Sequence, residues 1–235
     1  GWFELGNRAL QPSEFGKLVL IVILAKFGGK AMEENGRVQG IRNIMTMCIY
    51  TGIPVILVML QPDFGTAFVY LCILVGMLFA ARVSWKAILT AVVTAAVGLP
   101  LGYQYILNDE GKQRILTYLN PEAADALNEG YHTAQSQMVI GSGGMTGKGF
   151  FQEGTLTQLG YLPDDHTDYI FSSAVEAMGF IGGAIIIALY FILLLRTFYI
   201  AARAKDHFGS LICIGVLSMM LAHIFENIGM VMGIM

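Results

Sequence analysis

The sequence predicts an all-α polytopic membrane protein with about six transmembrane helices and one large loop outside the membrane. Of the 235 residues, 55% are hydrophobic and only 13% are charged, and the mean hydropathy is +0.63. A composition this apolar is typical of membrane proteins rather than of soluble domains. The net charge is −3 and no basic run occurs, which argues against binding to nucleic acid. We therefore expect a lipid bilayer, and no nucleic acid, among the partners.

Four apolar runs precede the large loop. Residues 2–12 are predicted as a loop, and Pro12 and Glu14 mark a helix start. The first run is short and contains two lysines, so it can span only if these reach the interface or if Lys17 faces protein. Residues 28–40 are predicted as the next loop. The four predicted spans are 14–29, 42–60, 65–81 and 86–107.

Residues 108–168 contain no apolar run of the roughly 20 residues that are needed to cross a bilayer. We predict that they form a single large loop. Two more spans follow, 169–195 and 211–235, with a polar connection at 196–210. The whole chain is therefore predicted as one membrane domain. Because it begins without Met and ends inside an apolar run, we expect it to be part of a larger membrane protein.

Basic residues near the span ends orient the chain. One set of loops holds nine of them, in short loops, and the opposite set holds five, so the first set is predicted to be cytoplasmic. The 108–168 loop, with nine acidic and three basic residues, then lies outside the cytoplasm. The nine are Lys26, Lys30, Arg37, Arg42, Arg82, Lys86, Arg196, Arg203 and Lys205, and the five are Arg8, Lys17, Lys112, Arg114 and Lys148.

Three aspartates stand at the end of the large loop. Asp164 and Asp165 follow a proline, and we interpret them as hydrated surroundings of the helix start. Asp168 lies nearest the apolar run, where a low dielectric makes a carboxylate a stronger base, so it is a candidate general base. Capping of the helix that opens at Tyr169, by Thr167 or Asp168, is the other interpretation. Spacing alone leaves both open.

A glycine-rich stretch at 141–149 invites comparison with a phosphate-binding P-loop. The comparison fails because Ser142 replaces the first glycine and Gly149 replaces the Ser or Thr after the lysine. Two interpretations remain: Lys148 and the loop amides meet a phosphate without that motif, or the stretch is a flexible turn.

Several charged residues fall inside the predicted spans. Glu176 lies about 12 Å beyond Asp168 along a straight helix, where a carboxylate is expected to face protein or a water-filled cavity. Gly179 and Gly183 indicate close helix packing. His223 and Glu226 are spaced to pair, as a proton relay or as a buried structural pair. The three cysteines lie in apolar runs, which favours packing over a disulfide or zinc site.

Five blocks of the sequence, taken in order, resemble the signature blocks of the SEDS proteins (shape, elongation, division and sporulation), the RodA/FtsW group. The GSGG motif, together with Glu153-Gly154-Thr155, is most similar to the RodA sequences of this group. The blocks are QPSEFGK at 11–17, QPDFGTA at 61–67, GY with QS at 130–136, GSGG with GKG at 141–149, and LPDDHTDYIF at 162–171.

The resemblance implies a fragment of a fold with roughly ten spans. It implies a peptidoglycan glycosyltransferase that polymerises lipid II at the outer face of the bacterial cytoplasmic membrane during cell elongation. It also implies a class B penicillin-binding protein as partner. It is compatible with a divalent cation, Mg²⁺ or Mn²⁺, as cofactor, and we expect no other cofactor. By this resemblance Asp168 is the catalytic base and Trp2 a substrate-binding residue. Further substrate-binding candidates are Lys17, Arg114, Lys148 and Glu176.

The chain departs from the family pattern at two positions. It has Glu176-Ala177 where the family has two consecutive glutamates, and Glu226 stands where the family is apolar. Two other functions are therefore retained as hypotheses. A flippase for lipid-linked precursors would use Glu176, His223 and Glu226 within the membrane, and a non-catalytic scaffold would use the large loop as its docking surface.

Overall fold

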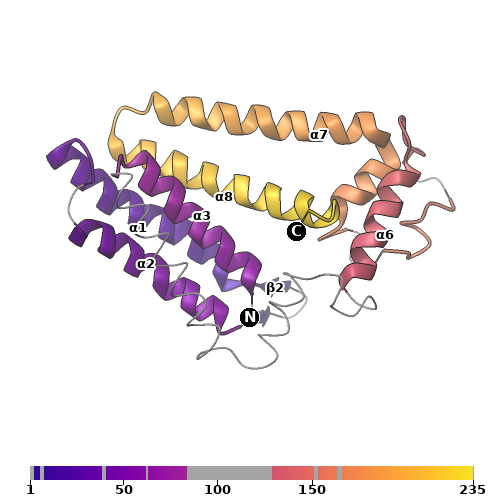
Figure 1. The fold of residues 1–235 in the computed structure, drawn as a ribbon, viewed down its shortest axis with the longest axis horizontal. Helices are drawn as coiled ribbons and strands as arrows, with labels where there is room; N and C mark the ends of the chain where they lie inside the picture. Colours follow the sequence, from indigo (N-terminus) through magenta and orange to yellow (C-terminus); the bar gives the residue numbers. More distant parts are fainter. Residues whose placement is uncertain are drawn as a thin grey trace. The chain divides into compact units, whose positions relative to one another are not determined.

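The computed structural model describes residues 3–5, 8–38, 41–61, 63–83, 129–150, 153–162 and 166–234. These residues form six helices and one antiparallel strand pair (Figure 1). The helical membrane class is confirmed, whereas the loop predicted at 2–12 contains strands β1 (Phe3–Leu5) and β2 (Arg8–Leu10). The helices are α1 (Pro12–Asn35), α2 (Ile41–Met59), α3 (Phe64–Ala80), α6 (Glu129–Ser142), α7 (Ile170–Ala202) and α8 (His207–Val231).

Three of the described helices are long and apolar enough to cross a membrane: Arg42–Met59 within α2, Ile170–Ala202 and His207–Val231. Helix α3 is apolar but shorter. Large apolar side chains such as Ile185, Phe191 and Ile192 are exposed along α7, as expected for a surface that faces lipid rather than water. The chain is therefore a membrane protein. The predicted span at 86–107 lies outside the described residues.

Helix α1 is longer than the sequence predicted. It begins at Pro12, as expected, but it continues through part of the predicted 28–40 loop and ends where Gly36 adopts φ 70° and donates its N–H to the Met32 carbonyl at 2.7 Å. This left-handed ending is common at helix C-termini. The last turns are helical because Ala31 and Met32 are buried against the rest of the protein. The charged residues of this stretch had favoured a loop, and this tertiary packing could not be inferred from them.

The chain divides into two units. Unit one comprises residues 1–105 and 194–223 and unit two residues 106–193 and 224–235. In unit one, α1, α2, α3 and the first part of α8 share one core around Leu24, Tyr70, Met77 and Leu211. Glycines allow the close helix packing: a Cβ built on Gly215 would lie 2.7 Å from Ile21.

The QPSEFGK and QPDFGTA blocks meet in unit one. Asp63 caps α3: its carboxylate accepts hydrogen bonds from the Thr66 N–H at 3.0 Å and the Thr66 hydroxyl at 2.9 Å. The same carboxylate accepts a 3.2 Å hydrogen bond from Gln11, the residue that precedes α1. Tyr70 adds a hydrogen bond from its hydroxyl to the Ser13 carbonyl at 2.9 Å. These contacts fix the N-terminal ends of α1 and α3 against each other.

Asp63→Ala is expected to lower the free energy of unfolding by about 1–2 kcal/mol, the cost of losing a helix N-cap side chain. The loss should appear as a lower midpoint of thermal unfolding in detergent. Glu33→Ala, which removes an exposed carboxylate from the other end of α1, is the matched control and should leave the midpoint unchanged. Equal midpoints for the two variants would contradict the capping role.

In unit two, α6 packs against the start of α7 and the end of α8. The Ser136 hydroxyl donates to the Val231 carbonyl at 2.8 Å and lies 3.0 Å from the Ser172 hydroxyl, and both serines are fully buried. Phe171, Val175 and Val231 form the apolar core of this unit. Helix α6 was not predicted, because the sequence in this part of the large loop lacks a clear apolar period.

The connection between α7 and α8 is shorter than the predicted 196–210 loop. Helix α7 continues to Ala202 and α8 begins at His207. The turn is fixed by a 2.9 Å hydrogen bond from the Ser210 hydroxyl to the Ala201 carbonyl and by the Asp206 carboxylate, which accepts from the Gly209 N–H at 3.0 Å.

Candidate functional site

Helix α7 is broken at Gly179, which has φ 71° and ψ −174°. The break separates a short segment, 170–178, from a longer one, 180–202. The longer segment alone is about 34 Å long, sufficient for the roughly 30 Å hydrocarbon core of a bilayer. Glu176 precedes the break, so it belongs to the short segment and not to the longer one.

The glycine loop, residues 143–149, replaces the main-chain hydrogen bonds that the break removes from α7. Two carbonyls before the break accept from loop amides, and two amides after it donate to loop carbonyls. In hydrocarbon such groups have no water to bond, so internal partners are required. The four bonds are Lys148 N–H to Glu176 O (3.0 Å), Gly149 N–H to Ala177 O (2.9 Å), Phe180 N–H to Gly144 O (2.9 Å) and Ile181 N–H to Met145 O (3.2 Å).

Three glycines are needed where the loop contacts α7. A Cβ on Gly143 would overlap the Val175 carbonyl, one on Gly147 would overlap the Ala177 carbonyl, and one on Gly179 would overlap the Gly147 nitrogen. Gly179 was predicted to serve close helix packing, but its close neighbour is the glycine loop. It also requires a backbone conformation that is essentially restricted to glycine.

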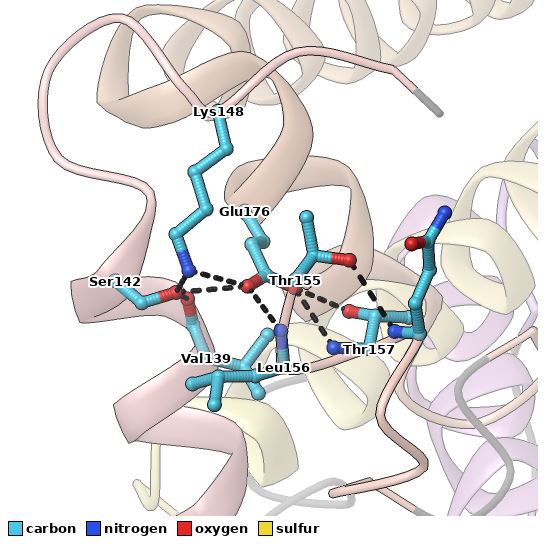
Figure 2. Close-up of polar contacts among 8 residues, drawn as sticks. Val139, Ser142, Lys148, Thr155, Leu156, Thr157 and Glu176 are labelled. Atoms are coloured by element: carbon cyan, nitrogen blue, oxygen red, sulfur yellow. Dashed lines mark hydrogen bonds and ion pairs between the residues drawn. The ribbon is translucent and has the colours of Figure 1, made fainter. Parts of the chain in front are cut away.

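Glu176 lies at the centre of a hydrogen-bonded cluster, shown in Figure 2. Its side chain is only 2% exposed. One carboxylate oxygen accepts from Lys148 Nζ at 2.7 Å, the Ser142 hydroxyl at 3.1 Å and the Leu156 N–H at 2.8 Å. The other accepts from the Thr157 N–H at 3.1 Å and the Thr157 hydroxyl at 2.5 Å. We call these five residues the Glu176 cluster.

The cluster brings together two candidates that the sequence had not paired. Lys148 forms an ion pair with Glu176, and its ammonium also donates to Ser142 at 2.8 Å. The Lys148 side chain is 32% exposed, so it faces solvent more than its partner does. Of the two interpretations of the glycine stretch, a purely flexible turn does not describe it, since the stretch is tied to α7 through both main chain and side chains.

Asp168, the predicted catalytic base, is exposed just before α7 begins. Its main-chain carbonyl accepts a 3.0 Å hydrogen bond from the Asn227 side-chain amide, which belongs to the part of α8 in unit two. This contact fixes the peptide at Asp168 while its carboxylate remains accessible. Sequence reasoning did not single out Asn227, and the 59-residue separation gives no local pattern that would have found it.

An apolar groove of about 520 Å³ lies in the same unit as Asp168. Residues on both sides of the Gly179 break contribute to it, so the bend determines its shape. Phe171, three positions after Asp168, is part of the lining. The full lining is Ile140, Phe171, Val175, Phe180, Gly183, Ala184, Ile187, Ala188, Phe191 and Met232.

Lys17 belongs to unit one. It is fully buried, and its ammonium is 2.7 Å from both the Glu14 carboxylate and His223 Nε2. The condition that Lys17 faces protein is therefore met. His223 had been considered together with Glu226, but its contact with Lys17 joins α8 to α1.

Two of the candidate substrate-binding residues, Trp2 and Arg114, lie outside the described residues. Within the described part of the chain, no group of three or more His, Cys, Asp or Glu side chains is placed to hold a metal ion. The divalent cation suggested by the sequence resemblance therefore stays a prediction.

The fold and the site define a helical, multi-span membrane protein with an exposed aspartate three positions before Phe171, a residue that lines an apolar groove. A family model described as "Cell cycle protein", named for FtsW, RodA and SpoVE, matches residues 1–235. The chain belongs to this family, which confirms the assignment made from the five sequence blocks.

Curated relatives cover the whole chain. "Peptidoglycan glycosyltransferase MrdB" of Escherichia coli K12 is 37% identical over 234 residues, which are 100% of this chain and 62% of that protein. "Stage V sporulation protein E" of Bacillus subtilis is 35% identical, over 99% of this chain and 62% of that protein. The chain thus spans about three fifths of the length of these relatives.

One solved structure is similar throughout. It is described as "Structural coordination of polymerization and crosslinking by a peptidoglycan synthase complex" and matches with a TM-score of 0.74 and 27% sequence identity. The match covers 99% of this chain and 62% of the other. The membrane fold inferred from the sequence is therefore that of a known peptidoglycan synthase component.

Proposed function

We propose that this chain is the catalytic part of a peptidoglycan glycosyltransferase that polymerises lipid II. The observation that carries the proposal is the position of Asp168. It is exposed just before α7 begins, and it lies three positions before Phe171, which lines an apolar groove. A carboxylate at such a place can serve a polar sugar while a lipid tail lies in the groove. Family relatives that are named peptidoglycan glycosyltransferases support this assignment.

In the proposed reaction, the 4-hydroxyl of the acceptor sugar attacks the anomeric carbon of the donor. The new C–O bond forms as the bond to the undecaprenyl pyrophosphate breaks, with inversion at that carbon. Asp168 accepts the hydroxyl proton as the attack proceeds. The bonding electrons leave with the pyrophosphate, whose charge requires nearby cations or N–H donors.

Lys148 is the cation that we assign to the pyrophosphate in unit two. Its ammonium has three N–H donors, of which two are used by Ser142 and Glu176. The third, on a side chain that is 32% exposed, can donate to a phosphate oxygen. Trp2 and Arg114 remain further substrate-binding proposals, as does Lys17, although Lys17 is buried.

The proposed location is the bacterial cytoplasmic membrane, with the 108–168 loop and Asp168 on the outer face, and the proposed role is in cell elongation. The similar solved structure is described as a complex that coordinates polymerization and crosslinking. A crosslinking partner, a class B penicillin-binding protein, is therefore proposed for this protein as well.

The proposal is tested with purified full-length protein in lipid nanodiscs supplied with lipid II. We expect glycan strands that are resolved by gel electrophoresis. If strands form only when the transpeptidase partner is present and Asp168→Asn leaves their formation unchanged, the protein is a scaffold. Translocation of fluorescent lipid II across liposomes, without any polymer, would instead support the flippase, which uses Glu176, His223 and Glu226.

A further inference from the structure

The Glu176 carboxylate connects three segments that are far apart in the sequence. Its hydrogen-bond donors come from the end of α6 (Ser142), from the glycine loop (Lys148) and from the 156–157 turn. The acceptor itself belongs to the short 170–178 segment of α7. No other described carboxylate is shown with donors from so many segments.

The acceptor capacity of Glu176 is filled. A carboxylate has about four lone-pair sites, and this one has five donors from four residues within hydrogen-bond distance, of which the Ser142 hydroxyl is shared with the Val139 carbonyl at 2.8 Å. It is also 1% exposed as a residue. A carboxylate in this condition has no free site for a substrate hydroxyl, so its role differs from that of the accessible Asp168.

The cluster and the bend in α7 are coupled through one residue. The Lys148 ammonium bonds the Glu176 side chain at 2.7 Å, while the Lys148 N–H bonds the Glu176 carbonyl at 3.0 Å. The glycine loop, which completes the hydrogen bonding of the Gly179 break, is thus attached to α7 through its main chain and also through the Lys148 side chain. Without the side-chain bond, the loop keeps only its main-chain contacts.

The short 170–178 segment of α7 connects the two features on which the proposed chemistry depends. Asp168 lies two residues before its start, and Phe171 and Val175 on it line the apolar groove together with Phe180 and Gly183 from beyond the break. A change in the bend would therefore move the groove walls relative to each other and relative to Asp168.

We propose that Glu176 is a positioning residue that binds the glycine loop and the 156–157 turn to α7 and so holds the Gly179 bend in the geometry that the reaction requires. This inference rests on the proposed glycosyltransferase function for its catalytic consequence, but its structural part stands on the contacts alone. It differs from a substrate-binding role for Glu176, because the carboxylate acts before any substrate arrives.

The structural part is tested by hydrogen exchange on full-length protein in nanodiscs without substrate. In Glu176→Gln, the amides of residues 148–149, 156–157 and 180–181 are expected to exchange at least about tenfold faster, the effect of losing one charge-assisted hydrogen bond. Thr157→Val, which removes one donor and keeps the side-chain shape, should give a smaller increase at the same amides. Amides of α2 and α3 should not change in either variant.

The catalytic part is tested by steady-state polymerisation of lipid II by the same variants. At saturating substrate, kcat of Glu176→Gln is expected to fall by roughly tenfold to a hundredfold, as for a small misplacement of reacting groups. Because both residues belong to one cluster, the double variant with Thr157→Val should lose less than the product of the two single effects. Glu153→Gln and Thr146→Val, which alter exposed side chains nearby, are the matched controls and should behave as wild type.

Two results would overturn the proposal. Unchanged exchange at all six amides in Glu176→Gln would show that the carboxylate does not hold the bend, whatever the wild-type activity. A rise in KM with unchanged kcat would assign Glu176 to substrate binding instead. Should the wild-type protein fail to polymerise lipid II, the proposed function fails, while the exchange measurement still decides whether Glu176 holds the bend.

Discussion

Asp168→Asn in the full-length protein is expected to lower kcat for lipid II polymerisation by about 10²- to 10⁴-fold, the usual contribution of a general base. Asparagine keeps the size of the side chain but cannot accept the hydroxyl proton. The main-chain bond from Asn227 to the Asp168 carbonyl is independent of the side chain, so the fold and the groove should be preserved. The measurement is strand formation by purified protein, followed over time.

The control for Asp168→Asn is Glu153→Gln, which removes a second exposed carboxylate from the predicted 108–168 loop and should leave kcat unchanged. Thermal unfolding of both variants should match that of the wild type. Full activity of Asp168→Asn would exclude Asp168 as the base. A loss of activity accompanied by a lower unfolding midpoint would instead show that the substitution disturbs the fold and not only the proton transfer.

Gly179→Ala is expected to destabilise unit two by more than about 3 kcal/mol, because backbone strain and a steric clash act together. At φ 71° and ψ −174° an alanine is strained. Its Cβ would also overlap the Gly147 nitrogen and the Met145 carbonyl, both main-chain atoms that cannot move aside without breaking the glycine loop. The expected observation is a large drop in the thermal unfolding midpoint in detergent, with loss of polymerisation.

Two other glycines provide matched controls for Gly179→Ala. Gly144 has φ 57° but open space around a Cβ, so Gly144→Ala should show the strain alone, about 1 kcal/mol. Gly141 has open space within α6 and no positive φ, so Gly141→Ala should be neutral or slightly stabilising. A midpoint for Gly179→Ala equal to that of Gly141→Ala would contradict the observed break in α7.

Hydropathy and segment length were sufficient to predict the long helices. The predicted spans at 42–60, 65–81 and 211–235 correspond to α2, α3 and α8, with boundaries that differ by a few residues. The reason is that a bilayer requires a continuous apolar helix of nearly fixed length. The family, too, was predicted from short blocks of sequence.

Side-chain partnerships could not be predicted in the same way. Lys148 and Glu176 are 28 positions apart, and Lys17 and His223 are 206 apart, so no helical or strand period relates them. Thr157 enters the Glu176 cluster through its N–H as well as its hydroxyl, and a main-chain donor leaves no mark in the sequence. Such pairs follow from how helices and loops pack.

The sequence by itself therefore determined the membrane class, most of the helices, the family and the aspartate on which the proposed chemistry depends. The tertiary structure decided that Gly179 breaks α7 instead of pairing two helices, and that Glu176 holds loops instead of standing alone in a span. The physical reason is that hydrophobic length is a local property of the chain. A buried carboxylate and the four main-chain groups that the break leaves without helical partners require hydrogen-bond partners from distant segments.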